Sequence, residues 1–107
     1  MDNDKSLDTG TQSASKGAEL IMYGGQNCGV CQVVWPKLQQ QLSTRWPDLT
    51  LRYIDCEKDP QACAQSQVFS LPVVRLFFDG QLFLEKIQVF SLGRFIEEID
   101  HLCHQYY

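Results

Sequence analysis

Two cysteines, Cys28 and Cys31, stand two residues apart in the stretch "NCGVC". A pair with this spacing can bind a metal, form a cross-link, exchange electrons through a reversible disulfide, or stay unreactive in a core. A structural metal site needs about four ligands, and the chain has no second Cys-x-x-Cys and no Cys-x-x-His. We therefore expect no metal and no cofactor at this pair.

The residues around the pair predict a loop between a strand and a helix. The apolar run 19–23 ends at Gly24-Gly25, the pattern of a buried strand that enters a loop. A helix is predicted from about Asn27 to Arg45, with a kink at Pro36. Its apolar face is formed by residues that recur every four positions, Val30, Val34, Leu38 and Leu42, joined by Cys31 and Trp35.

This position favours redox chemistry. The first turn of a helix carries unpaired N–H groups and the positive end of the helix dipole, so the pKa of a thiol at Cys28 should fall. The thiolate is the attacking species in disulfide exchange. Cys31, one turn further on and roughly 5 Å away at Cα, is the predicted resolving thiol. The alternative is a buried, unreactive pair.

The rest of the chain predicts an α/β fold. A strand is expected over 49–55 and a short helix over 60–67, capped by Asp59. Strands over 73–78 and 81–88 flank the turn signal Asp79-Gly80, and Ser91 caps a last helix. The order β-α-β-α-β-β-α predicts a mixed four-stranded sheet with helices on both faces.

Composition narrows the function further. The chain has 107 residues, enough for one domain, and a formal charge of −4 without a basic cluster, which argues against nucleic acid as a partner. No apolar run approaches the length of a membrane span. Residues 1–17 are polar and predicted to be a disordered arm, and 18–107 the domain. The N-terminal residues lack the basic start and apolar stretch of a secretory signal, so we expect a cytoplasmic protein.

Four features together resemble the thioredoxin superfamily, over roughly residues 19–102. They are Cys28-Gly29-Val30-Cys31 after a strand, Pro36 within the following helix, Leu71-Pro72-Val73, and Phe78-Asp79-Gly80. The resemblance implies a thioredoxin-like fold and a thiol–disulfide oxidoreductase that acts on disulfide-containing protein substrates. It also implies a separate, unidentified reductant and a monomer.

The resemblance assigns roles to the residues around the pair. Asn27, Gly29 and Val30 belong to the active-site loop. Pro72 is expected to be cis and to face the two sulfurs, and the backbone of Leu71 is expected to pair with a substrate peptide.

Several positions depart from the family pattern. Asn27 replaces a tryptophan, and Val30 replaces the proline of Cys-Gly-Pro-Cys. Met22 stands where the family has a buried acid that serves the resolving cysteine, Leu51 where that acid has a lysine neighbour, and Gln88 where a glycine lines the substrate groove. The last three departures, Met22, Leu51 and Gln88, keep open an alternative: a non-enzymatic binding or redox-sensing module on the same fold.

Three further cysteines need an interpretation. Cys56 and Cys63 are expected to be two buried free thiols. The alternative is a structural or regulatory disulfide, since their spacing is similar to one in protein disulfide isomerase domains. Cys103 lies on the apolar stripe of the last helix, so we expect it to be core.

Overall fold

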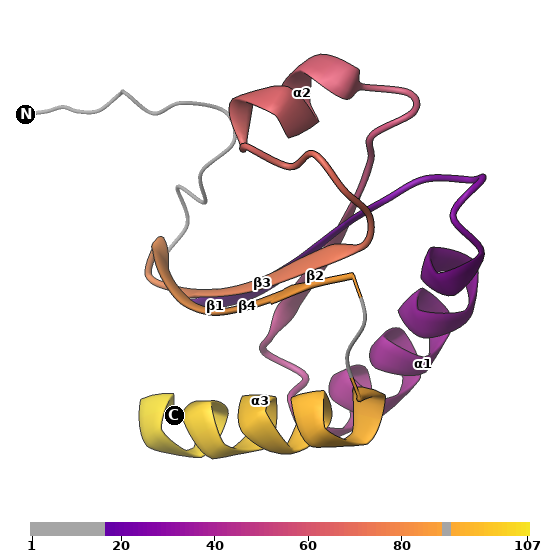
Figure 1. The fold of residues 1–107 in the computed structure, drawn as a ribbon. Helices are drawn as coiled ribbons and strands as arrows, with labels where there is room; N and C mark the ends of the chain where they lie inside the picture. The colour runs from indigo at the N-terminus through magenta and orange to yellow at the C-terminus, as the bar shows by residue number, and fades with distance from the viewer. Residues whose placement is uncertain (1–16, 89–90) are drawn as a thin grey trace, which may run out of the picture.

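The computed structural model of the chain describes residues 17–88 and 91–107 and follows the predicted order of elements (Figure 1). The strands and helices, in chain order, are β1 (Ala18–Gly24), α1 (Gly29–Arg45), β2 (Thr50–Asp55), α2 (Pro60–Gln65), β3 (Val73–Phe78), β4 (Gln81–Ile87) and α3 (Leu92–Tyr106). None of these helices, within the described residues, is long and apolar enough to cross a membrane.

The four strands form one mixed sheet in the order β2-β1-β3-β4. β1 pairs with β2 in parallel and with β3 antiparallel, and β3 and β4 form an antiparallel hairpin. Figure 1 shows α2 on one side of the sheet and α1 and α3 on the other. The predicted sheet with helices on both faces is therefore confirmed.

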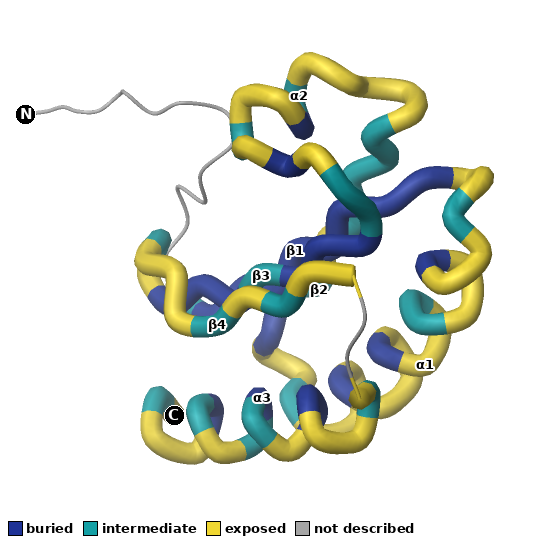
Figure 2. The backbone as a smooth tube through the Cα atoms, in the orientation of Figure 1, coloured by how far each residue is buried: buried dark blue, intermediate teal, exposed yellow. Residues whose placement is uncertain are grey.

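Strand β1 is the centre of the core. All seven of its residues are buried, and the dark tube of β1 runs through the middle of the molecule in Figure 2. Alternate side chains of a strand point to opposite faces. Leu20 and Met22 accordingly pack in the larger cluster, with α1 and α3, while Ile21 and Tyr23 pack in the smaller one, with α2.

Helix α1 differs from its prediction in two details. It begins at Gly29, not near Asn27, because Cys28 has extended backbone angles and acts as the N-cap. Val30, predicted to be on the buried face, is 54% exposed. A repeat of four drifts by about 40° per step from the helical period, so Val30 leaves the buried face, whereas the predicted Cys31, Leu38 and Leu42 are buried.

The turn between β3 and β4 forms hydrogen bonds with Gly17 and Tyr106. Asp79 and Gly80 both have positive φ, 53° and 83°, as a two-residue type I′ turn requires. Gly17 N donates to Asp79 Oδ1 at 2.7 Å, and Tyr106 Oη donates to the same oxygen at 2.8 Å. Gly17, placed in the predicted arm, is thus bonded to the domain. The rest of that arm, residues 1–16, lies outside the described residues.

The buried thiol of Cys103 gives a test of the core. Burial, with a smaller effect from the charge of Asp100, raises the pKa of this thiol to about 11. At pH 8 we expect iodoacetamide to alkylate Cys103 about a hundredfold more slowly in the native protein than in urea, because both thiolate fraction and access are low. Mass spectrometry of the alkylated peptide measures this. Comparable native and unfolded rates would contradict the packing of α3.

Candidate active site

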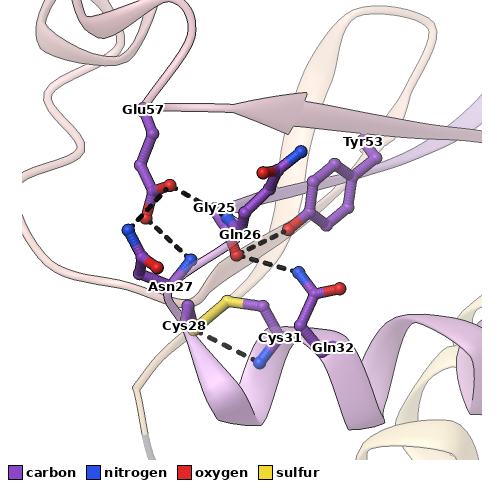
Figure 3. The surroundings of a disulfide bond; sticks show 8 residues. All are labelled: Gly25, Gln26, Asn27, Cys28, Cys31, Gln32, Tyr53 and Glu57. Carbon is purple, nitrogen blue, oxygen red and sulfur yellow. Dashed lines mark hydrogen bonds between the residues drawn. A yellow bond between two sulfur atoms is a disulfide. The ribbon is translucent and has the colours of Figure 1, made fainter.

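The cysteine pair closes a disulfide at the start of α1 (Figure 3). The two Cα atoms are 5.2 Å apart, and the Cys31 N–H donates to Cys28 Sγ at 3.2 Å between N and S. Cys31 is fully buried, whereas Cys28 is partly exposed. One sulfur therefore lies toward solvent at the N-terminus of a helix, and the other lies in the core behind it.

The carbonyl oxygen of Gly25, in the loop that precedes the cysteine pair, accepts several hydrogen bonds. It accepts hydrogen bonds from Cys28 N at 3.2 Å, from Gln32 Nε2 at 2.9 Å and, at the long distance of 3.5 Å, from Tyr53 Oη. Three segments, the loop, α1 and β2, thus meet at one oxygen, as Figure 3 shows. This arrangement sets the direction in which the chain enters α1.

Glu57 holds the same loop from the other side. Its carboxylate accepts from Gln26 N at 3.1 Å and from Asn27 N at 3.0 Å, one residue before Cys28 (Figure 3). A carboxylate that accepts two backbone N–H groups is a strong, charge-assisted contact. It also places a negative charge close to the cysteine that the sequence predicts to be the nucleophile.

The Gly24-Gly25 pair is explained by close approaches. A Cβ at Gly24 would lie 2.4 Å from Tyr53 Oη and 2.9 Å from Cys31 Sγ. A Cβ at Gly25 would lie 2.7 Å from Glu57 Oε2. All three distances are too short for a side chain, so the two glycines let β2 and its loop close against the cysteine pair.

Cys56 and Cys63 form a second disulfide, with their Cα atoms 5.6 Å apart. The expectation of two free thiols was therefore wrong, and the alternative of a disulfide is confirmed. The fold brings the two together because Cys56 directly follows β2 and Cys63 is the buried residue of α2. Cys56 N also donates to Gly24 O at 2.8 Å, which anchors the residue next to Glu57.

The predicted proline loop, which precedes β3, lies at the same end of the sheet as the cysteine loop, which follows β1. The Leu71-Pro72 peptide bond is cis, as the resemblance implied. Val73 pairs with Tyr23, near the end of β1, so Pro72 lies at the edge from which the chain continues to Cys28. Pro72 is buried and Leu71 is half-buried. Leu71 and Cys28 pack against the same core cluster, which contains Cys31.

Gln88 reaches this loop from β4. Its N–H donates to Pro72 O at 2.7 Å, and its φ of 65° lies in the left-handed region that favours glycine. The family position held by glycine thus keeps a glycine-like backbone here, with an exposed glutamine side chain beside the proline loop.

The positions of the family's buried acid and its lysine are apolar in the structure. Met22 is fully buried, and Leu51 is partly buried against the same cluster. Beside Cys31 there is a pocket of about 220 Å³. Its lining residues are Gln26, Cys31, Gln32, Trp35, Pro36, Tyr53 and Asp55.

Sequence reasoning missed Glu57, Gln32 and Tyr53 as parts of the site. The sequence did carry a signal for Tyr53 and Glu57. Neighbouring parallel strands end at the same edge of a sheet, so residues near the end of β2 meet the loop that follows β1. Gln32 carried no such signal, because an exposed glutamine on a helix is common.

The comparisons with known proteins agree with this geometry. The family model described as Thioredoxin matches residues 2–100. A thioredoxin of Mycobacterium tuberculosis is 35% identical over 73% of this chain, and one of Chlamydia muridarum is 30% identical over 71% of the chain and 74% of its own length. The match spans only 66% of the length of the mycobacterial protein.

Solved structures show the same fold. Thioredoxin O2 from Arabidopsis thaliana, in its oxidized state, superposes with a TM-score of 0.72 at 21% identity, over 81% of this chain and 76% of its own. Fasciola hepatica thioredoxin superposes with a TM-score of 0.70 at 19% identity, over 82% of this chain and 83% of its own. The chain therefore belongs to the thioredoxin family, and it carries a close-spaced cysteine pair at the N-terminus of α1.

Proposed function

We propose that this protein exchanges disulfides with protein partners through Cys28 and Cys31. The observation that carries the proposal is the asymmetry of the pair: one sulfur is partly exposed at a helix N-terminus, and its partner is buried one turn behind it. An exposed thiol can reach a substrate disulfide, and a buried one is protected from reacting before a mixed disulfide has formed.

The exchange proceeds in two steps. In the reduced protein the Cys28 thiolate attacks one sulfur of the partner's disulfide, and the other partner sulfur leaves as a thiolate. The Cys31 thiolate then attacks Cys28 Sγ, which restores the bond seen here and releases the second partner sulfur. The N–H of Cys31, 3.2 Å from Cys28 Sγ, is placed to stabilise the Cys28 thiolate. A separate reductase or small thiol supplies the electrons for the next turnover.

The surface beside the pair suits a protein partner. Val30 and Val33, in the first two turns of α1, are 54% and 56% exposed. In the family the backbone of the residue at Leu71 pairs with an extended substrate segment, and Leu71 is half-buried here. An extended segment with apolar residues beside its disulfide is thus the proposed substrate, bound by a monomer in the cytoplasm.

The second candidate is a binding or redox-sensing module. The observation that favours it is the fully buried Met22, which leaves the resolving cysteine without the acid that the family places behind it. A module of this kind would keep the fold and bind partners without turnover. The next experiment separates the two.

Replacement of either cysteine tests the proposed function. We expect Cys28→Ser to reduce insulin with dithiothreitol no faster than dithiothreitol alone, because the nucleophile is lost. Cys31→Ser should instead accumulate mixed disulfides with a protein substrate, visible on non-reducing gels. Cys103→Ala, which removes a buried thiol outside the site, is the control and should keep full activity. Equal rates for wild type and Cys28→Ser would favour the binding module.

Glu57 gives a second test, through its charge. Glu57→Gln keeps an oxygen that can accept from the loop but removes the carboxylate charge near Cys28. We expect the pKa of the Cys28 thiol to fall by about half a unit, since a neighbouring negative charge disfavours the thiolate. The pH dependence of Cys28 alkylation in the reduced protein measures this. Glu97→Gln, an exposed carboxylate on α3, is the matched control. A rise in pKa in Glu57→Gln would contradict this account.

Gln88→Gly tests the proline loop. Because Gln88 has a left-handed φ, glycine should relieve backbone strain and change the free energy of unfolding by up to about 1 kcal/mol in the stabilising direction. It should also lower the KM for a protein substrate, since the side chain beside Pro72 is removed. Gln67→Gly is the matched control: it has φ 60°, is exposed, and lies at the end of α2. That variant should gain stability without any change in KM. An unchanged KM in Gln88→Gly would contradict the role of this side chain.

A further inference from the structure

The second step of the proposed exchange needs a thiolate at Cys31. Only the deprotonated sulfur attacks a disulfide. Cys31 is fully buried, and burial in apolar surroundings disfavours a charged thiolate. Some group near Cys31 must therefore stabilise the negative charge, or the mixed disulfide would resolve slowly at neutral pH.

The apolar core surrounds Cys31 on the β1 side. Met22 belongs to the same buried cluster as Cys31 and has no acidic group. Polar side chains approach instead from β2, through the pocket of about 220 Å³ that Cys31 lines together with Tyr53 and Asp55. The register explains this placement: Met22 pairs with Tyr53 in the parallel ladder, so the two side chains leave the same face of the sheet side by side.

The Tyr53 hydroxyl is a polar group that lies near the Cys31 sulfur. A Cβ built at Gly24 would lie 2.4 Å from Tyr53 Oη and 2.9 Å from Cys31 Sγ, so the two atoms are separated by no more than these distances combined. One water spans such a gap. Figure 3 shows the ring of Tyr53 on the same side of the loop as Cys31.

The hydroxyl is also available. Its one hydrogen bond to the described residues, donated to Gly25 O, is long at 3.5 Å, and the Gly25 oxygen keeps two better donors without it. Burial, followed by the charge of Asp55, raises the pKa of Tyr53, so the hydroxyl stays protonated and can act as a donor. Its ring packs against Trp35, with 5.4 Å between centroids, which limits its movement.

We propose that Tyr53 is a positioning residue for the second step: its hydroxyl donates a hydrogen bond, directly or through one pocket water, to the Cys31 thiolate. This inference rests on the proposed function. The Cys31 proton passes to water in the pocket. The thiolate then attacks Cys28 Sγ, the Cys28–Cys31 bond forms, the bond between Cys28 and the partner breaks, and the partner sulfur leaves with the electron pair.

Two charged side chains, Asp55 and Glu57, act on the Tyr53 hydroxyl. Both disfavour a negative charge there. The described residues of β1 and of the first turns of α1 contribute no charged side chain to the pocket. A change in the pH profile on removal of the hydroxyl is therefore attributable to Tyr53, provided that Asp55 and Glu57 are left intact.

The experiment follows the two steps separately. The reduced protein is mixed with 5,5′-dithiobis(2-nitrobenzoate) in a stopped-flow instrument, where attack by Cys28 releases one thionitrobenzoate and attack by Cys31 releases a second. Mass spectrometry checks the state of Cys56 and Cys63 in each sample. Tyr53→Phe keeps the ring against Trp35 and removes the hydroxyl alone. Tyr23→Phe is the matched control, because the buried hydroxyl of Tyr23 has no hydrogen-bond partner within residues 17–88 and 91–107 and lies in the cluster on the other side of the sheet.

We expect Tyr53→Phe to leave the first release unchanged and to slow the second about tenfold at pH 7, the effect of a hydrogen bond to a charged group. The two proteins should converge as the pH rises, because the Cys31 thiolate then forms without help. Tyr23→Phe should match wild type in both steps. A second release in Tyr53→Phe within twofold of wild type at every pH would overturn the inference while leaving the proposed function intact. Absence of the first release in wild type would overturn the proposed function, and the inference with it.

Discussion

The parallel pairing of β1 with β2 is the constraint on which the site depends. Its register, with Gly24 opposite Asp55, makes both strands end at the same edge of the sheet. The loop to Cys28 and the turn that carries Cys56 and Glu57 therefore emerge next to each other. A shift of one residue would turn every side chain of β2 to the opposite face and would separate Tyr53 from Cys31. Two glycines at the end of β1 allow the approach, and Cys56 N, bonded to Gly24 O, continues the pairing past the last strand residue.

The environment of the cysteine pair is polar on one side and apolar on the other. Backbone N–H groups at the start of α1 and the carboxylate of Glu57 hold the exposed half of the loop, where Cys28 lies. The buried half meets Met22, Leu38 and Leu71 through the core cluster. In the exchange that we propose, this division separates two demands. The attacking sulfur needs access and a stabilised charge, whereas the resolving sulfur needs protection until a mixed disulfide places its target within reach.

The sequence predicted the elements of this fold well and the contacts between them less well. Each N-cap and turn signal, such as Asp59, Ser91 and Asp79-Gly80, acts locally, and the structure bears these predictions out. Val30 was misplaced because a four-residue repeat departs from the helical period within a few turns. The Cys56–Cys63 bond depends on how α2 folds back on the end of β2, which no local pattern specifies. Glu57 and Tyr53 act across the β1–β2 ladder, so their roles appear only once the register is known.

The apolar replacements at Met22 and Leu51 form a consistent pair. A buried acid with no cationic neighbour, or a lysine with no acid, would leave an uncompensated charge in the core, so a loss of one favours a loss of the other. Tyr53 follows Leu51 by two residues on the same face of β2 and pairs with Met22. A neutral hydroxyl at this position can donate to a thiolate without carrying a charge of its own through the rest of the cycle. The polar contact that we propose for Cys31 therefore comes from β2 and not from β1, and it lies in the pocket that Tyr53 and Cys31 both line.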